Sequence, residues 1–208
     1  MIKLNDEFVI FPNVKEAFFG ESKVLGFDTE LDYDSSDSRV ESSGVSRDNW
    51  GNYNFVNTGF IKVNAICSKL NIGLLNLVDP SGTRNGLDIY LKNFFTDEIL
   101  FRYRISCVSY SSLSNFTLRC ELYKGNSQLL ISGEWNTDYA YSSGSIIEYD
   151  FEQKQYKFPI LGNYNDHGGG FMTTYPYNSE YVPTKIEVVN NSGNNINFVK
   201  IDNIVVQN

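Results

Sequence analysis

Hydrophobic and polar residues alternate most regularly between residues 99 and 107. Every second side chain there is apolar or a thiol: Ile99, Phe101, Tyr103, Ile105 and Cys107. The residues between them include Arg102, Arg104 and Ser106. Because successive side chains of a β-strand point to opposite faces, this period of two predicts a strand with one buried and one solvent-facing side.

A second strand with the same alternation follows after a short connection. Its apolar set is Phe116, Leu118, Cys120 and Leu122, and its polar set is Thr117, Arg119 and Glu121. A link of about five residues predicts that the two strands pair antiparallel. The segment YKGNSQ then turns the chain into a third strand and makes a meander. We expect the apolar sets to share a core face and the charged residues to share a wet, charge-mixed face.

The same pattern predicts short strands along the whole chain and no helix of useful length. The predicted strands cover residues 7–11, 23–27, 55–63, 70–78, 86–95, 98–110, 115–123, 127–133, 145–151, 155–160, 184–190 and 196–206. Short strands with frequent turn signals are typical of a β-sandwich. The content of 14 Tyr and 15 Phe also favours strands. We therefore expect an all-β fold, a two-sheet antiparallel jelly-roll sandwich, in a single domain spanning residues 1–208.

Two long segments fall outside the predicted strands. Residues 28–52 are rich in acids and serines, which predicts a long polar loop or an arm that reaches out to a neighbour. Residues 162–183 are rich in Gly, Tyr and Asn and predict a second long connection.

The last segment of the chain predicts a hairpin whose second strand is the last strand of the sheet. TKIEVVN begins at Thr184, and INFVKIDNIVV ends at Val206, with an Asn-Ser-Gly-Asn turn signal between them. Ile201 and Ile204 are three residues apart, so a regular strand would send them to opposite faces. A bulge at Asp202 would return Ile204 to the core face.

This pattern, KIEVVNNSGN followed by INFVKIDNIVV, resembles the closing hairpin of the galactose-binding-like β-sandwich (jelly-roll) domains. That group includes many carbohydrate-binding modules, and other members are structural. The resemblance covers Thr184 to Val206 and implies the jelly-roll fold. It also implies that Asp202 can help hold a structural calcium ion. The alternative is that Asp202 stabilises the bulge by bonding nearby backbone.

The excess of acidic residues limits the classes of partner that we expect for the chain. The formal net charge is −8 and the isoelectric point is about 4.7, so the surface repels phosphate backbones and nucleic acid is not expected as a partner. No run of 18 apolar residues occurs, so we expect no membrane span. The start, MIKLNDEFVIF, lacks a secretion signal, which predicts synthesis in a cytoplasm and, for an extracellular role, release by lysis.

The three cysteines are expected to be buried thiols. Cys67, Cys107 and Cys120 have no CxxC spacing, which argues against a metal site built on sulfur. On the predicted strand pairing, Cys107 and Cys120 lie near each other in the core, so a disulfide is the alternative for that pair.

Aromatic residues in polar loops are the candidate binding residues. The candidates for carbohydrate contact are Trp50, Tyr53, Trp135, Tyr139, Tyr141, Tyr175 and Tyr177. Exposed rings can stack on the C–H faces of sugars while neighbouring Asn, Asp and Arg side chains bond the hydroxyls. The alternative is that these rings cap the ends of the sandwich core or pack at a subunit interface.

The sequence names no catalytic residues. His167 is the only histidine, and no GxSxG or HExxH accompanies it. The acids Glu134, Asp138 and Glu148 offer no selected pair for glycoside hydrolysis. The run from Asp32 to Asp37 lacks the glycine and the final glutamate of a calcium loop. We therefore expect a protein that is not an enzyme and needs no cofactor apart from the calcium that the resemblance implies.

Two functional hypotheses remain. The first is a virion structural protein of a bacteriophage, either a capsid decoration protein or a tail component, with other virion proteins or copies of itself as partners. The missing secretion signal and the Asn/Ser/Tyr/Gly-rich β composition favour it, because lysis delivers such a protein outside the cell. The second is a carbohydrate-binding module or an adhesin for a host surface glycan. A lectin-like domain on a virion would satisfy both hypotheses.

Overall fold

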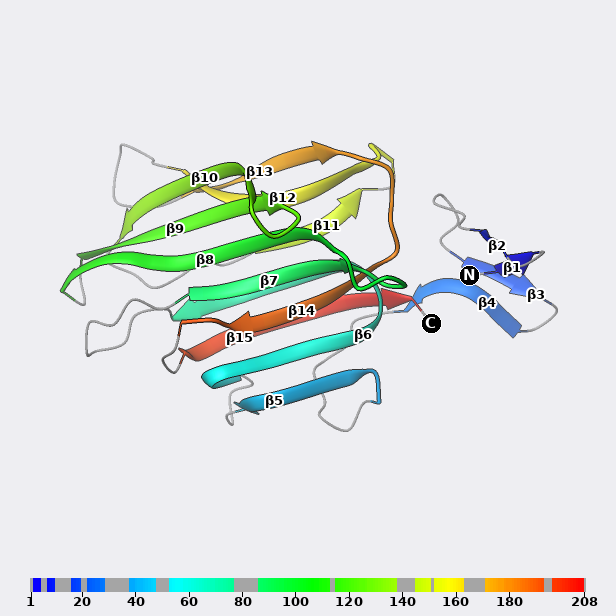
Figure 1. Ribbon diagram of the computed structural model, residues 1–208, viewed down its shortest axis with the longest axis horizontal. Coiled ribbons are helices and arrows are strands. Elements are labelled where there is room, and N and C mark those ends of the chain that lie inside the picture. The colour runs from blue at the N-terminus through cyan, green and yellow to red at the C-terminus, as the bar shows by residue number, and fades with distance from the viewer. Residues whose placement is uncertain are drawn as a thin grey trace.

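The structure is a computed structural model of the 208-residue chain (Figure 1). It describes the backbone of residues 2–4, 7–9, 16–19, 22–28, 38–47, 53–76, 86–112, 115–137, 145–150, 152–162, 171–192 and 196–207. Side chains are described for residues 38–47, 53–67, 69–70, 86–108, 117–134, 147–150, 152–160 and 174–192. All regular elements in these ranges are strands, so the predicted all-β class is confirmed.

Two antiparallel sheets form a sandwich. One sheet has the order β10 (Gln128–Thr137), β9 (Asn115–Lys124), β8 (Ile99–Ser112), β7 (Gly86–Asn93), β14 (Thr184–Asn190), β6 (Tyr53–Asn76) and β5 (Val40–Arg47). In the other, β6 is followed by β11 (Ser145–Asp150), β12 (Gln155–Gly162) and β13 (Phe171–Asn178), and β15 (Ile196–Gln207) also pairs with β6. We call the first the front sheet and the second the back sheet.

Strand β6 joins the two sheets. It is 24 residues long, and its stretch from Phe60 to Cys67 pairs with β14 of the front sheet. Its later stretch, from Lys69 to Ile72, pairs with β11 of the back sheet. The sequence predicted two separate strands here, at 55–63 and 70–78. The apolar residues between them, Ala65, Ile66 and Cys67, are buried, so the strand continues from one layer into the next.

Aromatic rings fill the space between the sheets. Phe158 of β12 is fully buried, and its ring centroid lies 5.1 Å from Phe101 and 6.4 Å from Tyr103, both on β8. Tyr156 adds a contact of 4.9 Å with Phe101. The predicted core face of 99–107 and 116–122 is confirmed, since the described members of it are buried except Ile99 at its end.

The cysteines are buried thiols, as predicted. None of the three is in a disulfide, and in the strand register Cys107 is opposite Leu118 while Cys120 is opposite Ile105, so the disulfide alternative is not realised. The Tyr103 hydroxyl donates to Cys120 Sγ at 3.2 Å. Burial raises the pKa of the Cys67 thiol to about 12, which keeps it protonated and unreactive.

The predicted closing hairpin is wrong. Strand β14 pairs with β6 and β7, whereas β15 pairs with β6 and with β4 (Ser22–Asp28), so the two strands are not neighbours. Asn190 Oδ1 accepts hydrogen bonds from Ser192 N at 3.0 Å and Ser192 Oγ at 2.6 Å, which turns the chain after β14. Turn residues in a sequence predict that the chain changes direction. They do not predict whether the next strand pairs in the same sheet or lies in the opposite one.

The pairing of β15 with β6 is irregular along its length, and one of its register shifts lies at the expected bulge near Asp202. Ile201 is opposite Ile72 and Asn203 is opposite Asn71, so Asp202 is an extra residue on β15. The end of β15 is also paired, with Val206 opposite Asp28 and Gln207 opposite Phe27 of β4. The side chains of β15 lie outside the described residues.

Two segments expected to be connections contain strands. Residues 40–47 of the expected arm at 28–52 form β5, which pairs with β6 at the edge of the front sheet. Residues 171–178 of the second expected connection form β13, which pairs with β12. Further strands, β1 (Ile2–Leu4), β2 (Glu7–Val9), β3 (Glu16–Phe19) and β4, lie beside one end of the sandwich in Figure 1.

Candidate functional site

The outward-facing side of the front sheet carries two rows of polar side chains. Register places Tyr90, Arg102 and Tyr123 side by side on β7, β8 and β9. The next row consists of Asp88, Arg104 and Glu121 on the same three strands. The residues that alternate with them, such as Leu91 and Tyr103, are buried in the core. The period of two therefore gathers six polar side chains, the outer polar cluster, on one surface.

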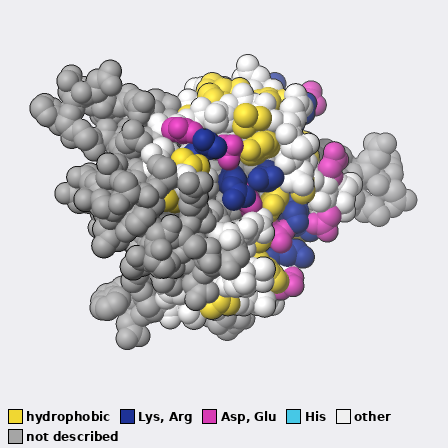
Figure 2. Space-filling view, turned by 60° about the vertical axis from the view of Figure 1, so that its left-hand side comes forward, with side chains coloured by type: hydrophobic (Ala, Val, Ile, Leu, Met, Phe, Trp, Pro, Cys, Tyr) yellow, Lys and Arg dark blue, Asp and Glu magenta, His cyan; other side chains and the backbone are white. Residues whose placement is uncertain are grey.

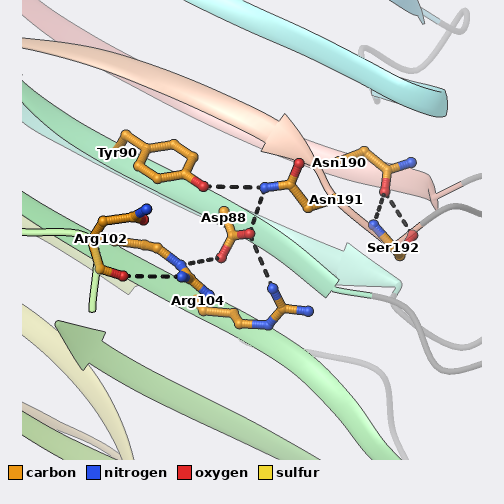
Figure 3. A network of polar contacts seen from close by, with 8 residues as sticks. Asp88, Tyr90, Arg102, Arg104, Asn190, Asn191 and Ser192 are labelled. Atoms are coloured by element: carbon orange, nitrogen blue, oxygen red, sulfur yellow. Dashed lines mark hydrogen bonds and ion pairs between the residues drawn. The ribbon is translucent and has the colours of Figure 1, made fainter. Parts of the chain in front are cut away.

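Asp88 is the centre of this cluster and is only 1% exposed (Figure 3). Its Oδ1 accepts a hydrogen bond from Arg102 Nε at 3.1 Å. Its Oδ2 accepts one from Arg104 Nη1 at 3.1 Å and one from Asn191 Nδ2 at 2.7 Å. A buried carboxylate is costly unless it is paired and hydrogen-bonded, and these three donors satisfy both conditions.

Asn191 reaches the cluster from the turn after β14. The Asn190–Ser192 hydrogen bonds and a bond from Asn190 Nδ2 to Val56 O at 3.2 Å hold this turn in place. Asn191 Nδ2 also donates to the Tyr90 hydroxyl at 3.2 Å. The turn that does not form a hairpin thus supplies an exposed amide to the outer polar cluster (Figure 3).

Two partly exposed tyrosines flank Arg102. The Arg102 guanidinium lies 4.8 Å from the centroid of the Tyr123 ring, and Lys92 Nζ lies 5.6 Å from the centroid of the Tyr90 ring. Burial and the negative charge of Asp88 raise the pKa of Tyr90. Burial and a hydrogen bond to Glu121 raise the pKa of Tyr123. Both hydroxyls therefore remain protonated and able to donate at neutral pH.

Gly86 leaves room for the Arg104 side chain. A Cβ at residue 86 would lie 2.8 Å from Arg104 Nη2 and 3.3 Å from Arg104 Cζ. Because only glycine lacks that atom, the guanidinium can lie against the start of β7 beside Asp88. The Arg104 side chain retains 26% of its exposure, so it is fixed and still accessible to a ligand.

Further ion pairs surround the cluster. Lys92 pairs with Glu187, Arg119 pairs with Glu134, and Lys185 Nζ lies 2.6 Å from Asp97 Oδ1. Basic and acidic side chains lie next to one another over one face of the molecule in Figure 2. The prediction that Arg102, Arg104, Arg119 and Glu121 share a charge-mixed face is confirmed.

The aromatic residues selected from the sequence are not brought together among the described residues. Tyr53 is fully buried in the core, with the Arg47 guanidinium 5.7 Å from its ring centroid. Tyr175 and Tyr177 on β13 are partly buried and pack against the core, and the Tyr177 ring centroid is 5.1 Å from that of Phe101. These positions correspond to the core-edge alternative that the sequence left open.

The other selected residues fall where side chains are not described. Trp135 lies on β10 opposite Leu118, and Asp202 lies on β15. Trp50, Tyr139 and Tyr141 lie outside the described residues altogether, as does His167. Sugar contact by these aromatic residues and calcium binding by Asp202 therefore stay predictions.

Sequence reasoning missed Asp88, Tyr90 and Asn191 as members of a site. The usable signal was an acid and a tyrosine at alternate positions of β7, next to the two arginines of β8. The segment GLDIYLKN was predicted to be a strand, but its pairing with β8 was not predicted. Asn191 gave no such signal, because it was assigned to a hairpin turn.

The described side chains contain no group of three or more His, Cys, Asp or Glu residues placed to hold a metal ion. No helix in the described part of the chain is long and apolar enough to cross a membrane.

No protein-family model and no curated protein matches the chain. Among solved structures it is similar to a legume lectin-like domain from Entamoeba histolytica, with 10% identity, a TM-score of 0.44, and 82% of this chain and 89% of that one covered. It is also similar to the CBM2 module of the evolved Dit of Lactobacillus casei BL23 phage J-1. That match has 13% identity, a TM-score of 0.43, and 93% and 94% coverage. At these scores neither likeness bears on what this chain binds.

Proposed function

We propose that the protein is a non-enzymatic carbohydrate-binding domain and that the outer polar cluster is its binding surface. The observation that carries the proposal is the row Tyr90–Arg102–Tyr123, set beside Arg104 and fixed from below by the buried Asp88. Partly exposed rings offer flat apolar surface, and the guanidinium and amide groups offer directed hydrogen bonds. This combination suits a ligand with both C–H faces and many oxygens.

The rigidity of the cluster supports binding. Rows on a β-sheet are held by the strand ladder, and Asp88 restrains both arginines, so little side-chain freedom remains to be lost when a ligand binds. Asp88 itself has both carboxylate oxygens occupied by its three donors. Such a carboxylate orients its neighbours and is not a free base, which agrees with a binding role.

Tyr90→Ala and Tyr123→Ala are each expected to weaken glycan binding about tenfold, which corresponds to about 1.4 kcal/mol. Each substitution removes a ring that borders Arg102 and leaves the core face of its strand unchanged. The measurement is binding to a broad glycan array, followed by affinity measurement on the glycans that bind. Trp50→Ala and Trp135→Ala on the same array test the aromatic residues selected from sequence.

Phe95→Ala is the matched control, because Phe95 is an exposed aromatic residue, 46% accessible, in the β7–β8 turn. It should bind as the unaltered protein does. If Tyr90→Ala, Tyr123→Ala and Phe95→Ala all fold and bind glycans equally, the outer polar cluster is not the binding surface. If the unaltered protein binds no glycan, the proposed function is wrong.

The virion structural role is the second candidate. It is supported by strands β3 and β4, which pair with each other and are connected to one end of the sandwich through the β4–β15 pairing, with the separate β1–β2 pair beside them (Figure 1). Such an extension suits contact with a neighbouring subunit. Antibody labelling of purified phage particles tests this role, and particles that lack the protein would count against it.

A further inference from the structure

The buried carboxylate of the outer polar cluster is fully used by the protein itself. Asp88 Oδ1 is bonded to Arg102, and Asp88 Oδ2 is bonded to Arg104 and Asn191. With 1% of Asp88 exposed, no sugar hydroxyl can donate to it. A ligand therefore meets the hydrogen-bonding groups of Arg102, Arg104 and Asn191 that are not used to bind Asp88.

Arg104 has the most hydrogen-bonding capacity left. A guanidinium carries five N–H donors, and within the described part of the chain the only bond of Arg104 is from Nη1 to Asp88. Arg102 uses Nε for Asp88 and Nη1 for Asn126 O at 3.2 Å. The remaining N–H groups of the two arginines form a surface of donors in fixed positions.

The acceptors on this surface are fewer. Glu121 lies opposite Arg104 in the register of β8 and β9, and it accepts a hydrogen bond from the Tyr123 hydroxyl. The Tyr90 hydroxyl oxygen, which accepts from Asn191 Nδ2, and the Asn191 carbonyl oxygen are further acceptors beside the arginines. Of the two acids of the cluster, Asp88 is buried and Glu121 is partly exposed, so Glu121 is the acid that meets a ligand directly: it repels an anionic group and accepts a bond from a neutral sugar hydroxyl.

Building on the proposed glycan-binding function, we infer that the ligand is an acidic glycan whose anionic group, a carboxylate or a sulfate, is bound by Arg104 beside Arg102. The planar fork of a guanidinium matches two oxygens of such a group. The protein as a whole carries a net charge of −8, so this surface is a local site of donors on a molecule that otherwise repels polyanions.

The test uses two matched pairs of polysaccharides. Polygalacturonate is compared with its carboxyl-reduced form, and dextran sulfate is compared with dextran. We expect binding to at least one acidic member and at least tenfold weaker binding to its neutral partner. We also expect that binding weakens between about 0.05 M and 0.5 M NaCl because salt screens the charges. The two pairs separate a carboxylate ligand from a sulfate ligand.

Two substitutions with opposite expected signs make the test specific. Arg104→Gln should weaken binding of the acidic polysaccharide at least tenfold because it removes the fork. Glu121→Gln should strengthen it, because a repelling charge is removed while the side-chain shape is kept. Lys157→Gln is the control for Arg104→Gln, because each removes one positive charge. Lys157 lies on β12, outside the outer polar cluster, and pairs with Asp150. Lys157→Gln should leave binding unchanged.

Four results would overturn the inference. Equal binding to acidic and neutral members would mean that the ligand is recognised through its neutral groups. Weaker acidic binding in Glu121→Gln would mean that Glu121 accepts a sugar hydroxyl and does not repel an anionic group at this site. The proposed function would stand in both cases. Equal weakening by Arg104→Gln and Lys157→Gln would mean that net charge, not this site, governs binding. Absence of binding to these four polysaccharides and to a broad glycan array would overturn both the inference and the proposed function.

Discussion

Phe158→Ala is expected to lower the free energy of unfolding by about 3–5 kcal/mol. The ring is fully buried between the sheets and contacts Phe101 and Tyr103 of the opposite layer. Its removal loses apolar burial and leaves a cavity that rigid strands on both sides cannot close. Denaturant unfolding followed by tryptophan fluorescence measures the change, and the midpoint should fall with little change in slope.

Phe95→Ala is the control for this prediction as well. Phe95 is 46% exposed in a turn, so the same chemical change there should alter stability by no more than about 0.5 kcal/mol. A cost for Phe158→Ala close to that of Phe95→Ala would show that the two layers do not pack through Phe158. The two sheets would then not share a single aromatic core.

Much of the fold was predictable because alternation marks a half-buried strand directly. Phe101 and Tyr103 were assigned to the core and Arg102 and Arg104 to the wet face, and the structure agrees. Strand β13 was missed because its described side chains are exposed or partly buried, as befits an edge strand, and include Pro176. Its inward-facing residues include Tyr175 and Tyr177, which were interpreted as aromatic residues of a polar loop.

Strand neighbours were less predictable than strands. The sequence placed β14 beside β15, but β14 lies between β7 and β6. Local turn chemistry at Asn190 and Ser192 is compatible with either arrangement. The choice depends on long-range burial of Ile186 and Val188 against the core, which no local pattern encodes.

The candidate site was harder to predict than the fold for the same reason. Its members come from β7, β8, β9 and the turn after β14, and only the β8–β9 pairing was expected. The arginines were recognised as a surface feature. Asp88, the buried group that orients them, has the same sequence signature as any exposed strand acid, since burial of a charge depends on its partners in space.

Asp88→Asn is expected to lower the free energy of unfolding by about 2–3 kcal/mol, since it removes a buried charge that accepts three hydrogen bonds. Asparagine has the same shape but keeps one acceptor oxygen, and its NH2 group must face an N–H donor of Arg102, Arg104 or Asn191. The cost is below that of isolating a fully buried charge because the arginine side chains are 20% and 26% exposed and can hydrate. Denaturant unfolding measures it.

The effect of Asp88→Asn on binding separates an orienting role from a purely structural one. The variant removes a negative charge, so the net charge of the outer polar cluster becomes more positive. It also releases Arg102 and Arg104 from their fixed positions. Affinity for the acidic glycan should therefore fall, while its dependence on salt becomes steeper, because more of the remaining attraction is unspecific. A folded variant with unchanged affinity and unchanged salt dependence would show that Asp88 stabilises the front sheet without shaping the binding surface. A lower affinity with a steeper salt dependence would tie the buried charge of Asp88 to function. The loss of stability alone would not, because it is expected whether or not Asp88 shapes the binding surface.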